Sequence, residues 1–267
     1  MDIELTSTGG IVTVQFLCDA DDGNYNDKIV MDNNTFKVNL YNDISLNEIH
    51  PDHLALAIIL VANPFVGSVL NLPFAVSEQF LQSTQILSRY RVKCLDGIVS
   101  PFSPGTSSNP GLSFSGGADS TAALLLMPKN TISVFMDRPL IPRASLYNKS
   151  AAYATIEHAQ DIGFEVLKIS CDVEYMRSPL GFPTDLSNGV PAILLAKRMK
   201  LFGIAYGTVL ESLYGLGRMQ YKEYSETSHY KNWWNVFSQS GLPLSYPTGG
   251  ISEVGTEIIC SKSSIGN

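Results

Sequence analysis

The feature that most constrains this chain is a serine and glycine segment that separates a short apolar run from an Ala- and Leu-rich run. Residues 111–126 read GLSFSGGADSTAALLL. The apolar residues before Ser115 are typical of a short buried strand, and residues 118–126 are typical of a helix. Two adjacent glycines at such a junction let the backbone turn tightly and approach a ligand closely. The segment therefore predicts a strand, a tight loop and a helix, in that order.

Short apolar runs and helical segments continue to alternate after this loop. The apolar runs are residues 131–137, 164–170 and 203–208, and the helical segments are 118–126, 145–163 and 188–203. This alternation is typical of βαβ units, which place parallel strands in one sheet and helices on its faces. The sequence therefore predicts an α/β protein with a doubly wound, Rossmann-like parallel sheet in its C-terminal part.

The N-terminal part has a different pattern. Strand-like runs separated by turn-rich segments predict a small antiparallel meander, and a mostly helical stretch follows. The runs are residues 11–17, 28–32 and 35–40, and the helical stretch is 45–91. Residues 97–111 are rich in Pro, Ser and Gly, which is typical of a linker. We expect a smaller N-terminal α+β domain over 1–100, a linker over 101–110 and a second domain over 111–267.

Residues 54–76 carry no charge and are long enough to cross a bilayer. Asn63 and Pro64 interrupt the stretch, and no Lys or Arg cluster flanks it. We therefore expect a buried helix that ends before Pro64 and then a short extended segment, rather than a membrane span.

Composition limits the class of protein. Apolar residues make up 45% of the chain and charged residues 16%, which is typical of a globular protein. A net charge of −7 gives no general attraction for phosphate backbones, so we expect no nucleic-acid partner. Four separated cysteines without a CxxC pair, and an N-terminus without a signal-peptide pattern, predict reduced thiols in the cytoplasm.

The glycine loop has the chemistry of an anion site. Gly116 and Gly117 remove Cβ atoms, so backbone N–H groups at the start of the helix can approach an anion. Ser115 and Ser120 add hydroxyl donors. Asp119 suits an anion site only if its carboxylate holds the loop together or binds Mg²⁺. These residue types predict a nucleotide phosphate site, against the alternative of an ordinary glycine turn.

The loop SGGADS also resembles the SGGxDS pyrophosphate loop of the N-type ATP pyrophosphatases, also called the PP-loop superfamily. The resemblance covers about residues 109–260 and includes VFMDRP, LSNGVPAILLAKRMKLFGIAYGTVLES and GLPLSYPTGGISEVGTEII. The order and spacing are most similar to those of the 7-cyano-7-deazaguanine synthases, although Arg138-Pro139 replaces their aromatic-Gly-Gln pattern. The resemblance implies a PP-loop ATP pyrophosphatase domain over 111–267, and residues 1–100 match no family.

The resemblance implies an ATP- and Mg²⁺-dependent ligase or amidating enzyme. A carboxylate or carbonyl oxygen of a small substrate attacks the α-phosphate, pyrophosphate leaves, and ammonia or an amine displaces AMP. The residues expected to bind the nucleotide are Ser113, Ser115, Gly116, Gly117, Asp119, Ser120, Met136, Asp137, Gly207 and Thr208. The residues expected to act in catalysis are Asp119, Arg138 and Glu211, with Asp119 as the Mg²⁺ ligand.

Several of these assignments have structural alternatives. Asp137 and Arg138 either contact a ligand at the end of a strand or are ordinary surface residues. Gly207, Thr208 and Glu211 either line a pocket or form a simple turn after a strand. Cys171 is a candidate sulfur carrier or a buried core thiol, with the core favoured. Three cations are candidates to neutralise pyrophosphate, and the sequence does not choose among Arg218, Lys222 and Lys262. His229, Trp233 and Trp234 lie in an aromatic segment that either covers the substrate or packs a helix.

Two other functions stay open. One is a sulfur-transferring PP-loop enzyme, which needs reactive cysteines, and the other is a non-catalytic adenine-nucleotide-binding module. The deazaguanine enzymes continue into a cysteine cluster that binds zinc, whereas this sequence has only Cys260 near its end, so we expect no zinc. Residues 1–100 are the candidate surface for a protein partner or a homodimer, and no membrane association is expected.

Overall fold

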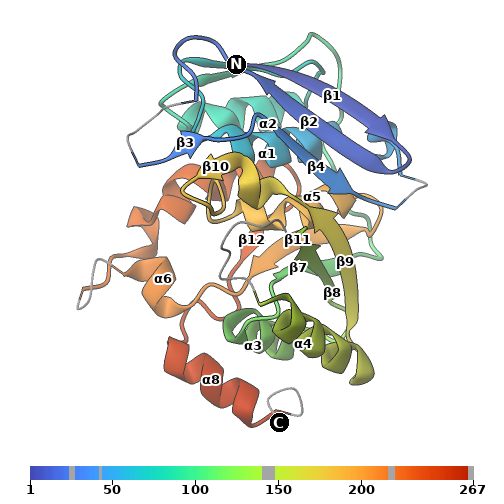
Figure 1. Ribbon diagram of the computed structural model, residues 1–267, viewed down its shortest axis with the longest axis vertical. Coiled ribbons are helices and arrows are strands. Elements are labelled where there is room, and N and C mark those ends of the chain that lie inside the picture. The colour runs from blue at the N-terminus through green and yellow to red at the C-terminus, as the bar shows by residue number, and fades with distance from the viewer. Residues whose placement is uncertain (24–27, 42–43, 140–147, 216–219, 264–267) are drawn as a thin grey trace.

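The computed structural model describes residues 1–23, 28–41, 44–139, 148–215 and 220–263, and one ten-stranded sheet runs through the molecule (Figure 1). From one edge to the other the strands are β12 (Leu244–Ser245), β11 (Leu201–Tyr206), β7 (Asn109–Phe114), β8 (Ile132–Asp137), β9 (Glu165–Cys171), β4 (Thr35–Asn39), β2 (Ile11–Leu17), β1 (Asp2–Thr8), β5 (Val69–Asn71) and β6 (Arg91–Lys93). The protein is therefore α/β with a mixed, mostly parallel sheet.

The five strands from β12 to β9 are parallel to one another. Helices α3 (Ala118–Leu126) and α4 (Lys149–Asp161) pack on one face of these strands, and α5 (Val190–Leu195) and α1 (Pro51–Ala62) lie on the other. Alternate residues of β8 divide between the two cores, since Val134 belongs to the α5 side and Phe135 to the α3–α4 side. Burial on both faces is the reason why these strands read as continuous apolar runs.

The remaining elements are short. They are α2 (Glu78–Ser83), α6 (Leu210–Tyr214), α7 (Asn235–Gln239), α8 (Glu253–Ser261), a π-helical turn (His229–Trp234) and 3-10 turns at Leu46–Glu48, Thr84–Ile86, Val173–Met176, Ser187–Gly189 and Tyr224–Glu226. A two-stranded ribbon joins β3 (Val30–Met31) to β10 (Arg177–Ser178).

The antiparallel meander exists, but one of its strands differs from the prediction. β1, β2 and β4 form it, and the predicted third run contributes only the two residues of β3, which pair with β10 outside the main sheet. Gly9 and Gly10 have φ of +56° and +78°, so they close a two-residue hairpin between β1 and β2. This loop type matches the twist of the flanking strands and needs residues that tolerate positive φ.

The two predicted domains share one sheet and one core. β4 pairs antiparallel with β9 through Val38 and Cys171, and α1 packs against α5 within the larger hydrophobic core. The expected linker has no helix or strand from residue 97 until β7 starts at Asn109. The division into a domain over 1–100, a linker over 101–110 and a domain over 111–267 stays a prediction.

The uncharged stretch 54–76 contains most of α1, as the sequence predicts. α1 begins with Pro51 in its first turn, because His50 accepts a hydrogen bond from the backbone N–H of Asp52, and the helix ends before Pro64. Every residue from Asp52 to Ala62 is buried. Among the helices of the described ranges, none combines the length and the apolar composition needed to cross a bilayer.

Candidate functional site

The predicted loop lies between β7 and α3, at the carboxyl end of the central parallel strand. Gly116 has φ +75°, and a Cβ there would lie 3.1 Å from Cα and Cβ of Ala152 in α4. Gly117 is the N-cap of α3. Backbone geometry therefore favours glycine at 116, whereas Gly117 has φ −83° and a Cβ there would meet only Ser115 Oγ at 3.4 Å, an ordinary contact. The predicted strand, loop and helix are present at the predicted residues.

Two serines hold the loop in shape. The Ser120 hydroxyl accepts a hydrogen bond from the Ser115 backbone N–H at 3.2 Å and donates to the Gly117 carbonyl at 3.1 Å. The two hydroxyl oxygens, Oγ of Ser115 and Oγ of Ser120, are 2.9 Å apart. Ser120 is buried, whereas Ser115 and Gly117 are exposed. Ser120 therefore acts from inside the loop, and Ser115 remains accessible to a ligand.

The loop leaves backbone donors at the start of α3. No described residue accepts a hydrogen bond from the N–H of Gly116, Ala118 or Asp119, as is usual for the first turn of a helix. The helix dipole adds positive potential at this end. Together these groups form a place for an anion next to exposed Gly117.

The end of β11 contacts the same helix start. A Cβ on Gly207 would lie 2.5 Å from Ser120 Cα and 2.6 Å from Ser120 N. Glycine is therefore required at 207 by the close approach of the end of β11 to the start of α3, and its predicted place in a nucleotide pocket stays a prediction. Thr208 follows, and its carbonyl accepts from the Thr248 hydroxyl at 3.2 Å.

Asp119 connects the loop to α8. Its Oδ1 accepts a hydrogen bond from the Thr256 hydroxyl at 2.7 Å, and α8 packs against α3. Cys260 on α8 lies at the same junction, where its Sγ is 3.4 Å from the Ala118 carbonyl oxygen. Burial, with the nearby carboxylates of Glu257 and Asp119, raises the pKa of the Cys260 thiol. A neutral thiol is a poor nucleophile, so this cysteine packs α8 against the loop.

The charged side chains after β8 are held by neighbours. Asp137 accepts from the Tyr153 hydroxyl at 2.8 Å and pairs with Lys149, whose Nζ is 2.6 Å from Oδ1. Arg138 Nη1 lies 2.9 Å and 3.0 Å from the two carboxylate oxygens of Glu174. Lys149 is a cation at this edge that sequence reasoning did not select, because isolated lysines are usually solvated.

A small cavity separates the loop from these charges. Its volume is about 40 Å³, and it is lined by Ser113, Phe114, Ser115, Phe135, Met136, Arg138, Phe182 and Asn188. The carbonyl oxygen of the Asn188 side-chain amide is buried there, and no residue in the described part of the chain donates a hydrogen bond to it. The structure thus brings Ser113 and Met136 to one cavity with Arg138, but a nucleotide base needs more room than the one or two waters that this volume holds.

Other predicted residues lie farther along the edge. Glu211 is exposed in α6 and accepts from the backbone N–H of Glu253 at 3.2 Å, so it caps α8. No hydrogen bond or ion pair joins Lys222 or Lys262 to the loop among the described residues, and Arg218 lies outside them. Cys171 is buried in the main core, and burial raises the pKa of its thiol, which agrees with the favoured structural role.

An aromatic cluster lies beyond the ends of β11 and β12. Tyr206 and Tyr246 are neighbours with ring centroids 6.4 Å apart, and His229 stacks on Tyr246 with centroids 5.2 Å apart. Asp185 contacts His229 Nε2, while His229 Nδ1 and the hydroxyls of Tyr246 and Tyr224 are buried and form no hydrogen bond with any described residue. Burial raises the pKa of Tyr224 to about 12. Sequence reasoning anticipated the aromatic segment but not Asp185, since pairing across 44 residues leaves no local signal.

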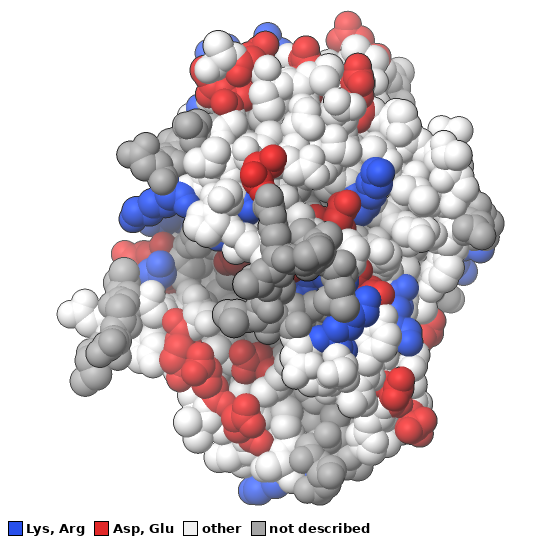
Figure 2. Space-filling view, in the orientation of Figure 1, with Lys and Arg blue, Asp and Glu red and all other residues white. Residues whose placement is uncertain are grey.

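Acidic side chains gather on one side of this edge, over α6 and α8 (Figure 2). They include Glu211 and Glu253, which are both exposed. An anionic ligand beside them needs the loop N–H groups or a bound cation to offset the repulsion. Within the described ranges no three His, Cys, Asp or Glu side chains form a metal-binding group. The expected absence of zinc stays a prediction.

Comparisons of the chain with protein-family models, with curated proteins and with solved structures gave no match. Function is therefore inferred from the geometry of the loop and its surroundings.

Proposed function

We propose that the protein is an ATP-dependent adenylating enzyme whose pyrophosphate site is the loop from Ser115 to Ser120. The main support for the proposal is the N–H groups of Gly116, Ala118 and Asp119, from which no described residue accepts a hydrogen bond, next to the close approach of Gly207 to Ser120. If the five parallel strands are numbered 1 to 5 in chain order, starting from β7, their order across the sheet is 5-4-1-2-3. The direction in which successive strands are added therefore reverses between β7 and β11. Doubly wound sheets bind ligands at such a reversal.

The proposed reaction is the formation of an amide or related bond through an adenylate. A carboxylate oxygen of the substrate attacks the α-phosphorus of ATP, and the bond to pyrophosphate breaks. Ammonia or an amine then attacks the substrate carbonyl carbon, AMP leaves with the former carboxylate oxygen, and the amine proton passes to solvent. The chain contributes orientation and charge stabilisation, because phosphorus chemistry of this kind needs little covalent help from a protein.

Mg²⁺ usually binds through one or two carboxylates and the nucleotide phosphates. Asp119 supplies one carboxylate at the loop, and its Oδ1 is shared with Thr256. Mg²⁺ would neutralise pyrophosphate as it leaves. Two described cations, Arg138 and Lys149, follow β8 in the chain, and each is paired with a carboxylate.

The test separates binding from turnover. Titration calorimetry should show Mg²⁺-dependent ATP binding, and release of pyrophosphate from ATP should require a small acid and ammonium. Asp119→Ala should lower ATP affinity by tenfold or more, about 1.4 kcal/mol, and abolish the Mg²⁺ dependence. Thr256→Val, which removes the hydrogen bond but keeps the carboxylate, should retain that dependence. Unchanged ATP affinity in Asp119→Ala would contradict the proposed site.

A non-catalytic nucleotide-binding module is the second candidate. The ion pair between Arg138 and Glu174 favours this candidate, because Arg138 is the cation that was expected to contact the substrate. Tight ATP binding without pyrophosphate release would support it. Sulfur transfer is disfavoured, because Cys171 lies in the core and the pKa of Cys260 is raised.

A further inference from the structure

A second surface of the molecule has unpaired backbone groups, far along the sheet from the loop. β1 pairs with β2 over its whole length, but on its other side it meets β5 at Asp2 alone. In the described part of the chain, no strand covers β1 from Glu4 to Thr8 on that side. Unpaired edges of this kind are templates for another strand.

The hydrogen bonds of β1 show which residues face the open side. Met1 uses both backbone groups toward β5, since its amino group contacts the Val69 carbonyl at 2.9 Å and its carbonyl accepts from Asn71 N–H at 3.0 Å. Along a strand the side on which N–H and C=O point alternates with each residue. Leu5 and Ser7 therefore direct their N–H and C=O to the open edge, whereas Glu4 and Thr6 bond to β2.

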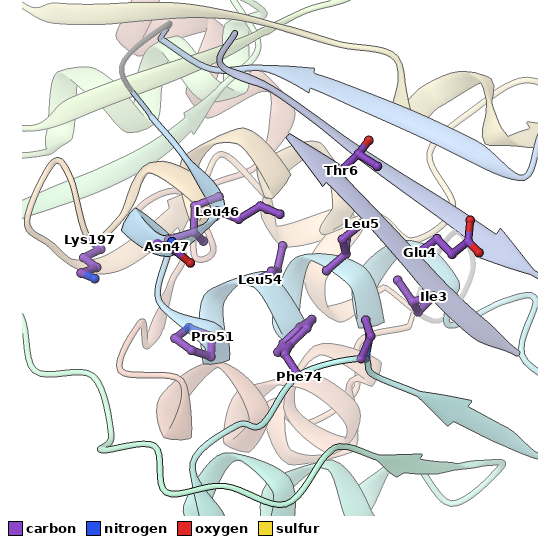
Figure 3. Close-up of a pocket in the computed structure, with 12 residues that line it drawn as sticks. Ile3, Glu4, Leu5, Thr6, Leu46, Asn47, Pro51, Leu54, Phe74 and Lys197 are labelled. Atoms are coloured by element: carbon purple, nitrogen blue, oxygen red, sulfur yellow. The ribbon is translucent and has the colours of Figure 1, made fainter. Parts of the chain in front are cut away.

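A groove of about 690 Å³ runs beside this edge. Apolar side chains of β1, the turn at Leu46–Glu48, α1 and the segment after β5 line it, and Figure 3 shows Leu5, Leu46, Leu54 and Phe74 around it. Its volume is within the range of roughly 300–1,000 Å³ that is typical of ligand clefts. Lys197 lies at the end near Asn47 and has no ion pair among the described residues.

We propose that this edge and groove bind an extended peptide segment of another protein by strand addition. Leu5 and Ser7 supply the main-chain hydrogen bonds, and the groove takes apolar side chains at alternate positions, which is how strand addition combines affinity with selectivity. An acidic residue of the peptide lies toward Lys197. This proposal does not depend on the proposed enzymatic function.

A second copy of this chain fits the groove less well than such a peptide. Its own β1 reads DIELTST, in which Ile3 is already buried and Leu5 is the one large apolar side chain left to contribute. A peptide with an apolar residue at every second position places more apolar side chains in the groove than a second β1 does. An acidic residue at its end can form an ion pair with Lys197.

The proposal is tested with fluorescent hexapeptides and the full chain. Positions 2 and 4 vary among Val, Ile, Leu and Phe, positions 1, 3 and 5 are Thr, and position 6 is Glu or Lys. Anisotropy should show saturable binding with a preference of about threefold for Glu, and Lys197→Glu should reverse that preference. Hydrogen exchange should show the Leu5 and Ser7 amides protected only when peptide is bound.

Matched variants separate strand addition from simple apolar binding. Ser7→Pro removes a donor that faces the open edge, where proline is tolerated, and should weaken binding about tenfold or more, while Ser7→Ala should not. Of two peptides, one N-methylated on its odd residues and one on its even residues, only one should fail to bind, because every second N–H of an added strand faces β1. Absence of saturable binding by every peptide, equal binding of the N-methylated peptides, or a dimer that protects Leu5 and Ser7 without peptide would each overturn the proposal.

Discussion

The two parts of the sheet expose backbone groups in different ways. At the end of β7 the unpaired N–H groups belong to the first turn of α3 and point beyond the strand, next to Gly207 of β11. At β1 the unpaired groups of Leu5 and Ser7 point sideways, along an open edge. The N-termini of helices that follow parallel strands lie at one edge of the sheet, where their N–H groups can bind an anion. An antiparallel hairpin at the side of a sheet instead exposes N–H and C=O groups with which another strand can pair.

The two parts also differ in their buried ionisable groups. In the parallel part, Arg138 and Glu174 form an ion pair near the binding edge. In the N-terminal part, His53 of α1 is buried, its Nε2 lies 3.2 Å from the Ser240 carbonyl oxygen, and its Nδ1 has no hydrogen-bond partner among the described residues. Burial lowers the pKa of His53 to about 3, so the imidazole is neutral in the folded protein. Four predictions test this comparison.

The largest effect is expected where the end of β11 meets the start of α3. Gly207→Ala would place a Cβ 2.5 Å from Ser120 Cα, so the β11 end or the loop must move. We expect a loss of about 4 kcal/mol in the free energy of unfolding and loss of ATP binding. Urea unfolding and calorimetry measure both. Gly250→Ala is the matched control, because a methyl group at that position has nothing within 4 Å; similar losses in both variants would contradict the contact.

The N-terminal part should lose stability in acid through His53. The folded pKa of about 3 lies below the unfolded value of 6.5, so the unfolded chain binds the proton first. Stability is therefore complete above pH 6.5 and is lost as the pH falls toward 3, by about 1.4 kcal/mol per unit within that window. Urea unfolding at pH 7 and pH 5 should show a drop of about 2 kcal/mol. His53→Gln, which can still donate to Ser240, should reduce the slope; an unchanged slope would contradict the assignment.

Loss of the ion pair between Arg138 and Glu174 should lower the free energy of unfolding by less than Gly207→Ala does. Glu174→Ala removes the carboxylate that accepts two hydrogen bonds from Arg138 Nη1, in a site where the two side chains are mostly covered, with 17% and 10% exposed. We expect a loss of about 2 kcal/mol in the free energy of unfolding, discounted for this partial exposure. The double variant Arg138→Met with Glu174→Met should lose less than Glu174→Ala. A larger loss in the double variant would show that the pair itself, rather than an unpaired charge, determines stability.

The smallest effect is expected within the loop. Ser120→Ala removes the bonds to the Ser115 N–H and the Gly117 carbonyl but leaves the backbone donors in place. We expect ATP affinity to fall about fivefold, which corresponds to about 1 kcal/mol for hydrogen bonds of this kind. The exposed Ser225→Ala is the control. Loss of all binding in Ser120→Ala would indicate that the hydroxyl contacts the ligand directly.

The sequence predicted the parallel part well because its signals are local. The strand, the glycine loop and the helix over 118–126 lie where the apolar run and Gly116-Gly117 place them. The helix that ends before Pro64 also follows from local rules, since proline restricts the residue before it. The strand β1 was missed, because the alternation in DIELTST contains only two large apolar residues.

What the sequence determined by itself is the order of elements and the residue types of the loop, because both depend on neighbours in the chain. Tertiary structure decided which groups remain available for a ligand. Arg138 is held by Glu174, Gly207 lies against Ser120, and Leu5 faces an open edge. The first two outcomes depend on a partner far away in the chain, and the third depends on where the pairing of β1 with β5 stops. Sheet order and packing, rather than any local pattern, set all three.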